Sequence, residues 1–489
     1  MKNGTARVCW FLLLTAIVLI GIGQLPPLTI GGYKVRCIDV LAKILPDQQT
    51  PEPATTGQEH PQQPTTLRAT TPQESASAPD SVAADSVAAQ GPVFIDTVPP
   101  PPDMVPIEDF TPMTAQATQS MDVFYAALDK SRGQLGRPVR IAFFGDSFVE
   151  GDILTADLRQ ALQQAYGGEG VGYVDIASPF IQYKGTVRHS ATGWTDHSIL
   201  ERSKTYYDEA GISGRYATAQ YAGASVRYSG VSQYAGLASW SVATAYVSAD
   251  DTLEVTAFIN DTDTVALPLA GNGQVQALCW EGRISKIRLT APTSGFIAYG
   301  MALEGRSGVT VDNFSLRGCN GTALTNIPRQ QLRQFARLRP YDLIVLQFGL
   351  NIAEKDRTDY TAYTAQMRRV IEHLRTAYPH AAILVMSVGD RADRIDGELR
   401  TIPGVKALVR QQRQLAMESG VAFWNTYEAM GGEGSILRMA SLGQAGKDYT
   451  HITRSGGKAV AQSLMRALQF GHEQYSRKTH YLQEQYDQE

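Results

Sequence analysis

The sequence predicts an α/β protein: a three-layer α/β/α sandwich with a flavodoxin-like parallel sheet, plus an inserted all-β sandwich domain and an N-terminal membrane anchor. In residues 119–196 and 308–475, short apolar runs alternate with helical patterns, as in doubly wound folds. Between 197 and 307 the pattern changes to short strands separated by turn residues, which is typical of a β-sandwich. We therefore expect one α/β domain in two parts, with the β domain between them.

Residues 1–30 are predicted to form a signal-anchor or a signal peptide. Sixteen residues, 8–23, carry no charge, which suits a signal core or a short membrane span. No small-residue cleavage site follows, so the uncleaved anchor is the favoured alternative. Through this segment the membrane is an expected partner.

Two polar stretches are expected to lack stable structure. Residues 31–118 consist of a juxtamembrane segment and a linker rich in Pro, Thr, Gln and Ser, in which Arg68 is the only Lys or Arg beyond residue 47. Such a composition buries too little apolar surface to offset the entropy of ordering. The polar tail 476–489 is expected to fray.

The α/β pattern supplies five strands and five helices. The strands are expected at 139–145, 308–316, 341–348, 381–388 and 421–425. The helices are expected at 155–166, 326–338, 360–378, 403–419 and 456–470.

A serine directly follows the first of these strands. Gly145-Asp146-Ser147-Phe148 ends the strand, and a helical pattern begins near Thr155. Open α/β sheets place their chemistry at the carboxyl ends of strands, and glycine permits the tight turn. A nucleophilic hydroxyl and ordinary turn chemistry are both open interpretations of this motif by itself.

A histidine and an aspartate precede the last helix. Asp448 and His451 lie three residues apart in a predicted loop, so that both side chains can approach one point. A serine hydroxyl needs a base, and the base needs a group that fixes its tautomer. The alternative is a helix-capping aspartate beside a solvated histidine.

Two further strand ends carry candidate oxyanion donors. The strand that ends in Gly349-Leu350-Asn351 offers a side-chain amide, and the strand that runs into Gly318 offers a backbone N–H. Gly321 is a rival for the second position because the spacing there is loose.

These four segments, in this order, resemble the SGNH hydrolases, also called the GDSL-type esterase/lipase superfamily. The resemblance implies Ser147 as nucleophile, Gly318 and Asn351 as oxyanion donors together with the Ser147 N–H, His451 as base, and Asp448 as its orienting acid. The third segment departs from the common Gly-x-Asn-Asp pattern, since Ile352 takes the last place. No Gly-x-Ser-x-Gly motif occurs, which argues against the ordinary α/β-hydrolase fold.

The inserted domain is rich in aromatic residues, which favour either glycan binding or simple core packing. A tethered SGNH domain with a β-sandwich after its first β-α unit resembles the bacterial peptidoglycan O-acetylesterases. That likeness implies an acetylated polysaccharide substrate. It also implies a protein anchored in the inner membrane and facing the periplasm, or secreted to the periplasm if the signal is cleaved.

The predicted activity is that of a serine carboxylester hydrolase that works through an acyl-enzyme, without a metal or organic cofactor. An O-acetyltransferase with the same residues and an inactive glycan-binding protein are the alternatives. The net charge of −4 and the absence of a basic stripe argue against nucleic acid. Cys279 and Cys319 either pair or remain free thiols.

Overall fold

The computed structural model describes residues 28–30, 33–35, 94, 96–112, 119–201 and 207–488, and the chain divides into two units, Met1–Val87 and Ala88–Glu489. In the first unit, β1 (Leu28–Ile30) pairs antiparallel with β2 (Tyr33–Val35). The apolar run 8–23 of the predicted signal-anchor lies outside the described residues. Within the described ranges, no helix has the length and apolar character needed to cross a membrane.

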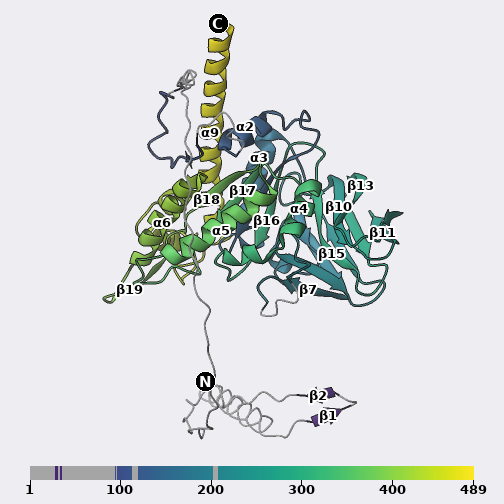
Figure 1. Cartoon of the computed structure of the whole chain (residues 1–489). Coiled ribbons are helices and arrows are strands. Elements are labelled where there is room, and N and C mark those ends of the chain that lie inside the picture. Colours follow the sequence, from purple (N-terminus) through teal and green to yellow (C-terminus); the bar gives the residue numbers. More distant parts are fainter. Residues whose placement is uncertain are drawn as a thin grey trace, which may run out of the picture. The chain divides into compact units, whose positions relative to one another are not determined.

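A parallel sheet forms the centre of the second unit (Figure 1). Its strands follow the order β16-β4-β17-β18-β21, which is 2-1-3-4-5 in chain order and is the flavodoxin-like arrangement. Gly145, the last residue of β4, pairs with Ser315 of β16 and Gln347 of β17. The carboxyl ends of these three strands therefore meet at one edge. The bounds are β4 (Val139–Gly145), β16 (Val309–Ser315), β17 (Leu343–Gln347), β18 (Ala382–Met386) and β21 (Ala422–Trp424).

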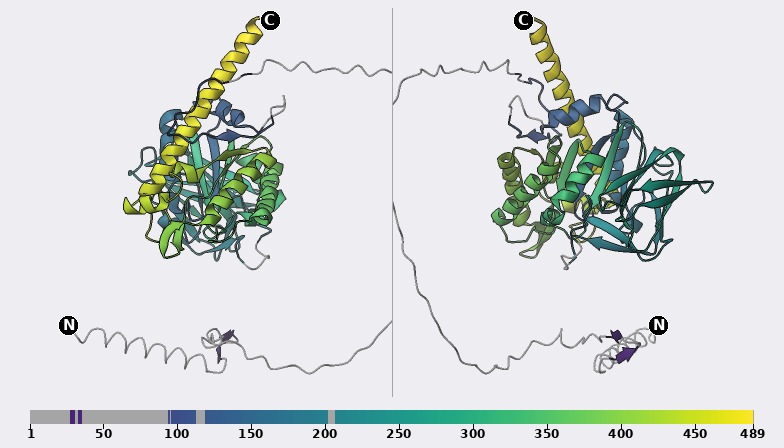
Figure 2. Two further views of the ribbon diagram at one scale, coloured as in Figure 1. Left: turned by 90° about the vertical axis from the view of Figure 1, so that its left-hand side faces the viewer. Right: turned by 45° about the vertical axis from the view of Figure 1, so that its right-hand side comes forward.

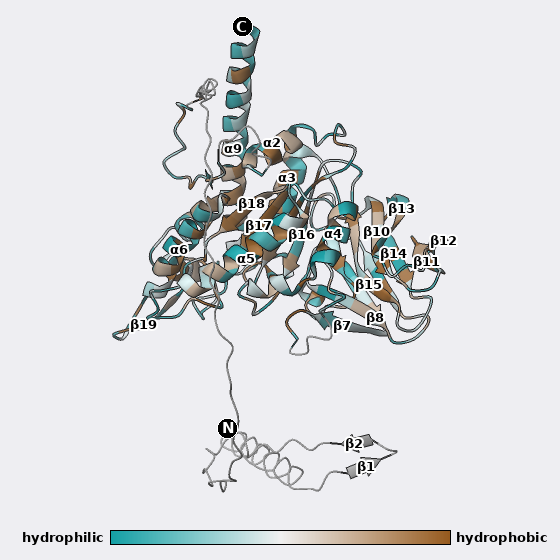
Figure 3. Ribbon diagram, viewed as in Figure 1, coloured by the Kyte–Doolittle hydropathy of each residue, from teal (hydrophilic) through white to brown (hydrophobic). Residues whose placement is uncertain are grey.

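Helices cover both faces of this sheet, because its strands are apolar on both sides (Figure 3). On one face α3 packs against α9, which also contacts α2; on the other, α5 lies between α4 and α6. The chain begins α6 with Pro403 and ends it at Gly420, whose φ of 57° is left-handed. The bounds are α2 (Met121–Asp129), α3 (Thr155–Tyr166), α4 (Arg329–Leu338), α5 (Thr361–Ala377), α6 (Pro403–Ser419) and α9 (Arg454–Gln488).

Shorter elements complete the α/β domain. The hairpin of β19 (Ala392–Ile395) and β20 (Glu398–Thr401) follows β18, and α7 (Thr426–Ala429) and α8 (Ser435–Ser441) precede α9. Short 3-10 turns are η2 (Glu150–Asp152), η3 (Ile181–Tyr183) and η5 (Thr322–Asn326).

The inserted domain is a sandwich of two antiparallel sheets. One has the order β13-β10-β15-β8-β7, with β5 also paired to β15, and the other has the order β12-β11-β14-β9-β6. The bounds are β5 (Gly172–Asp175), β6 (Arg188–Thr192), β7 (Trp194–Ser198), β8 (Arg215–Ala219), β9 (Ser225–Ser229), β10 (Trp240–Ser248), β11 (Leu253–Ile259), β12 (Asp263–Leu269), β13 (Gln276–Ile284), β14 (Lys286–Thr290) and β15 (Ile297–Glu304).

The insert begins earlier than the sequence pattern indicated. The expected boundary was residue 197, yet β5, β6 and β7 already belong to the two sandwich sheets. Their sequences are short and polar on alternate positions, so they resemble the connections of an α/β domain until their partner strands are known. Most of the insert's aromatic residues lie in the core, including Tyr216, Tyr228, Trp240, Tyr246 and Trp280, whereas Tyr221 is exposed.

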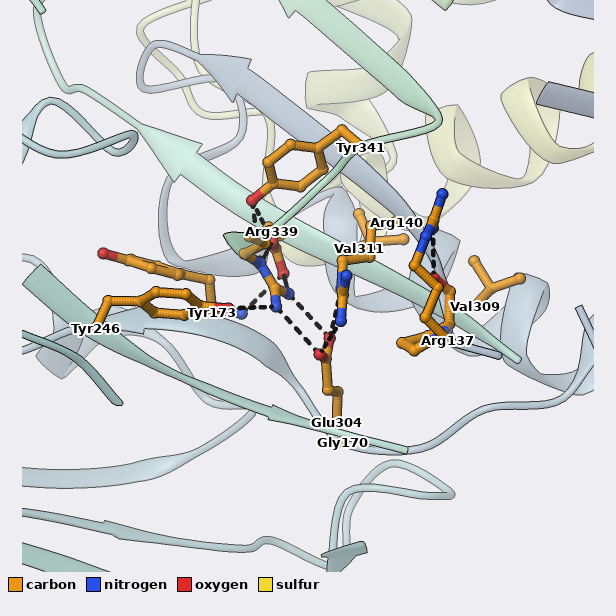
Figure 4. A network of polar contacts seen from close by, with 12 residues as sticks. Arg137, Arg140, Gly170, Tyr173, Tyr246, Glu304, Val309, Val311, Arg339 and Tyr341 are labelled. Carbon is orange, nitrogen blue, oxygen red and sulfur yellow. Dashed lines mark hydrogen bonds and ion pairs between the residues drawn. The ribbon is translucent and has the colours of Figure 1, made fainter. Parts of the chain in front are cut away.

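A buried network of charges joins the insert to the parallel sheet (Figure 4). Glu304, at the end of β15, accepts hydrogen bonds from Arg140 of β4 at 2.7 Å and from Arg339, which follows α4, at 2.9 Å. Arg339 also donates to Asp312 of β16, at 2.6 Å, and Asp312 accepts a bond of equal length from the Tyr341 hydroxyl. Burial opposes ionisation of Glu304, but the two arginines outweigh it and lower its pKa to about 2. The insert is thus fastened by charge as well as by packing.

Part of the predicted linker is ordered, so that the expectation of disorder up to residue 118 was wrong for its last part. In β3, Glu108–Asp109 pairs with the edge strand β21. Asp96 and Asp103 form ion pairs with Arg477 and Arg466 of α9, at 2.7 and 3.0 Å. The composition of the segment does not reveal these contacts, because the partners of the two aspartates lie more than 300 positions away.

The predicted frayed tail is also wrong. α9 continues to Gln488 and projects beyond the body of the domain (Figure 2). No Gly or Pro interrupts the chain after Gly471, and Lys478 forms an ion pair with Asp122 of α2 at 2.8 Å. Nothing in this sequence therefore breaks the helix, and the ion pair of Lys478 with Asp122 attaches it to α2.

Candidate active site

The structure brings Ser147, His451 and Asp448 together. Ser147 Oγ lies 3.0 Å from His451 Nε2, and His451 Nδ1 lies 2.7 Å from Asp448 Oδ2. The serine comes from the loop after β4 and the other two residues from the loop before α9, so that Ser147 and His451 are 304 positions apart. This is the arrangement in which a base can take a serine proton while a carboxylate fixes its tautomer.

The Asp448 carboxylate binds both the backbone and the imidazole of the loop that carries it, and this fixes the position of His451. Asp448 Oδ1 accepts the backbone N–H groups of Thr450 and His451, at 3.1 and 3.2 Å, and Oδ2 accepts the His451 ring. Burial raises the pKa of Asp448, but these hydrogen bonds outweigh it and leave that pKa below its ordinary value. Between them, Tyr449 takes a left-handed φ of 50° and accepts a hydrogen bond from the Ala392 N–H. The carboxylate is therefore ionised and oriented toward the imidazole.

The predicted oxyanion donors lie at the adjoining strand ends. The Asn351 side-chain Nδ2 is 3.2 Å from Asp146 Oδ2 and 3.0 Å from the Cys319 carbonyl, so that it links the loops after β4, β16 and β17. Gly318 is exposed, with a φ of 76°, and its N–H donates to no described residue. The N–H of Ser147 is equally free among the described residues.

Gly321, the rival of Gly318, has a different role. It is buried, its N–H donates to Cys319 Sγ at 3.2 Å, and a Cβ added there would lie 2.8 Å from Phe348. Gly321 therefore shapes the turn, while Gly318 has the free and exposed N–H.

Comparisons with known proteins agree with this geometry. The model of the GDSL-like lipase/acylhydrolase family matches residues 281–458. The catalytic domain is of the SGNH hydrolase type. Family and triad together make it a carboxylesterase by class. No curated protein matches the chain.

A solved structure shares the fold of this chain. A structure titled "Peptidoglycan O-acetylesterase in action, 5 min" matches with a TM-score of 0.62 at 21% identity and covers 75% of this chain and 99% of that one. A family two carbohydrate esterase from Cellvibrio japonicus matches at 11% identity, over 59% of this chain and 98% of that one, with a TM-score of only 0.24. A salicylyl-acyltransferase from a tetracycline biosynthetic pathway matches at 14% identity, over 60% and 96%, with a TM-score of 0.28. Of these, the first shows that the two-part architecture has a known counterpart.

Asp146, which the sequence analysis did not single out, organises the oxyanion side of the SGNH site. It is fully buried beside Ser147 and accepts the Phe148 N–H at 2.9 Å as well as the Asn351 amide. Burial raises the pKa of Asp146 to about 6, although hydrogen bonds from backbone N–H groups, including that of Gly349, partly offset the shift. The signal in the sequence was its place between a strand-ending glycine and the serine.

This raised pKa predicts a stability difference that depends on pH. Between pH 4 and 6 the folded protein holds a proton on Asp146 that the unfolded chain releases, so the contribution of this group to the unfolding free energy falls as the pH rises through that window. We expect Asp146→Asn to remove that dependence. The unfolding free energy of the variant should gain about 3 kcal/mol relative to the unmodified protein between pH 4 and 7, from a shift of 3.8 to about 6.

Urea unfolding of both proteins across this pH range measures the difference directly. Because the new amide also changes hydrogen bonding by a constant amount, only the slope against pH is informative. Parallel curves would show that the Asp146 carboxyl titrates as it does in water.

A second missed carboxylate, Asp152, fixes the loop that carries Ser147. It is fully buried and accepts hydrogen bonds from Thr155 and Asn313, both at 2.9 Å. Arg159 and Lys184 lie 3.3 and 3.6 Å from it. Burial alone would raise the pKa of Asp152, but the two cations lower it well below its ordinary range. Since Lys184 precedes β6, this carboxylate ties the nucleophile loop to the insert.

The two cysteines do not pair. Cys279 is an exposed free thiol in the insert, and Cys319 is a buried free thiol in the turn that precedes the η5 segment. The sequence left open a disulfide or two free thiols, and the structure contains the free thiols. Cys319 contributes its carbonyl to the orientation of Asn351.

Proposed function

We propose that this protein is a carbohydrate O-acetylesterase of the bacterial cell envelope, and that its substrate is an O-acetyl group of peptidoglycan or of a related polysaccharide. The observation that carries the proposal is the openness of the triad. The side chains of His451 and Asp448 are 48% and 52% exposed. An ester attached to a bulky polymer can reach such a site, whereas an enzyme for long acyl chains needs an apolar pocket that buries the chain.

Two features support a polysaccharide as the alcohol part of the ester substrate. The inserted sandwich is joined to the catalytic sheet and also reaches the Ser147 loop through Lys184. The structural counterpart at TM-score 0.62 is titled as a peptidoglycan O-acetylesterase, and it shares nearly its whole length with this chain. The envelope location rests on the apolar run 8–23 and the polar stretch after it.

The proposed reaction has two steps. His451 Nε2 takes the proton of Ser147 as Oγ bonds to the acetyl carbonyl carbon. The N–H groups of Ser147 and Gly318 receive the oxyanion, together with one N–H of the Asn351 amide that leaves Asp146 or Cys319. The C–O bond to the sugar then breaks, and His451 returns the proton to the sugar oxygen. In the second step His451 deprotonates a water that attacks the acetyl-serine, and it returns this proton to Ser147 Oγ as the ester bond breaks and acetate leaves.

Release of acetate from polysaccharides tests this proposal. The full-length protein should liberate free acetate from O-acetylated peptidoglycan or from acetylated xylan, and should also hydrolyse 4-nitrophenyl acetate. It should act poorly on 4-nitrophenyl palmitate. Activity confined to the palmitate ester would overturn the proposal, and acetyl transfer to an added sugar without free acetate would assign the alternative O-acetyltransferase.

A further inference from the structure

The segment Ser178–Lys184 of the insert stands at the rim of the catalytic site. Its η3 turn packs against Gly151, four residues after Ser147, so closely that a Cβ on Gly151 would lie 2.9 Å from the Tyr183 carbonyl and 3.2 Å from the Tyr183 Cβ. Arg454, three residues after His451, donates to the same carbonyl at 2.9 Å. The backbone of Tyr183 is therefore held between the loop of the nucleophile and the loop of the base.

The residues that follow Tyr183 are fixed as well. The Lys184 N–H donates to the Ile181 carbonyl at 2.8 Å, and its ammonium pairs with Asp152. The Gly185 carbonyl accepts the Gln233 amide of the sandwich, and the Thr186 hydroxyl donates to Asp152. A backbone held at each of these positions presents its side chains with little freedom, which lowers the entropic cost of binding through them.

The Tyr183 side chain nevertheless faces solvent. It is 55% exposed, and no described residue forms a hydrogen bond with its hydroxyl. A single exposed aromatic is usually without significance. Here the backbone that carries the ring is held between the loop of Ser147 and the loop of His451.

The inner side of the same segment is closed to a sugar. The pocket there, at the carboxyl end of β16, has a volume of about 30 Å³, which is room for a water molecule. A glycan therefore meets the segment on its exposed side, where the flat ring of Tyr183 matches the apolar C–H face of a pyranose.

From this combination, and resting on the proposed function, we propose that segment 178–184 is the sugar-binding subsite, in which Tyr183 stacks on a pyranose ring of the acetylated glycan. The ring orients the polymer so that its acetyl group reaches Ser147. Tyr183 is a specificity-determining residue, because a small aryl ester has no sugar to stack.

The test compares two esters with matched tyrosine variants. For each full-length protein, kcat/KM is measured for acetate release from the acetylated polysaccharide and for 4-nitrophenyl acetate, and the ratio of the two is taken. Tyr183→Ala should lower this ratio about tenfold. Tyr183→Phe, which keeps the ring, should stay within about twofold. Tyr486→Ala removes a tyrosine that is 77% exposed on α9 and should leave the ratio unchanged.

Each outcome decides between the proposals. If the unmodified protein releases acetate from polysaccharide and Tyr183→Ala keeps its ratio, the subsite is wrong and the proposed function stands. An equal loss in Tyr183→Phe would assign the effect to the hydroxyl and overturn stacking. If the unmodified protein hydrolyses only the aryl ester, both proposals are wrong. Thermal unfolding of the variants should coincide, since the ring is largely outside the core.

Discussion

Replacing Ser147 by alanine is expected to lower kcat for 4-nitrophenyl acetate by about 10⁴- to 10⁶-fold. The reason is the 3.0 Å contact between Ser147 Oγ and His451 Nε2, which has no function without the hydroxyl. His451→Ala should cost a similar factor, and the double variant should lose no more than either alone, because residues that act as one unit are not additive.

Steady-state hydrolysis and covalent labelling with a fluorophosphonate check this expectation. The probe should label the unmodified protein and not Ser147→Ala. Ser441→Ala is the matched control, since that serine of α8 is exposed and its hydroxyl donates to the Arg438 carbonyl of its own helix. Hydrolysis by Ser147→Ala at the unmodified rate would exclude this serine as nucleophile.

The second large effect concerns stability. Glu304→Gln should lower the unfolding free energy by about 3–5 kcal/mol, because it leaves the buried Arg140 without a carboxylate and takes one of two from Arg339. The control is Glu281→Gln in the same sandwich. Its ion pair with Arg306 has the same kind of contact, at 2.6 Å, but the two side chains are 54% and 64% exposed, so that the loss should stay below about 1 kcal/mol.

Chemical unfolding at several pH values extends this test. The folded pKa of Glu304 is about 2, below its ordinary value of 4.5. Its contribution is thus complete above about pH 4.5 and is lost as the pH falls toward 2. The gap between Glu304→Gln and the unmodified protein should narrow over that window, and equal losses in Glu304→Gln and Glu281→Gln would show that the network adds no more than a surface pair.

Because of this network, the insert cannot be deleted without destabilising the catalytic domain. Deleting the strands between residues 200 and 305 would remove Glu304 and Tyr246 together, and it would expose the apolar partners of both domains. Loss of activity in such a deletion would report unfolding, so single substitutions at the rim are the informative variants.

The sequence by itself determined the parallel sheet, and its resemblance to a known family supplied the triad. Strands such as Val139–Gly145 are apolar throughout, and their period and length are local properties that need no partner to be recognised. The three-residue spacing of Asp448 and His451 suggested that both side chains approach one point, and the order of the four motifs, through their resemblance to the SGNH hydrolases, implied their pairing with Ser147. The structure adds that the Asp448 carboxylate binds both the backbone and the ring of His451.

The tertiary structure alone decided how distant segments are joined. The sequence marks Asp146 only by its place before Ser147 and does not mark Asp152. Their buried contacts with Asn351, Asn313 and Lys184, which come from other elements, are visible only in the structure. The start of the insert at β5 and the ordered residues 96–112 likewise depend on partners far along the chain. The physical reason is that hydrogen bonds and ion pairs between distant residues leave no periodic trace in the sequence, whereas hydrophobic periodicity within one element does.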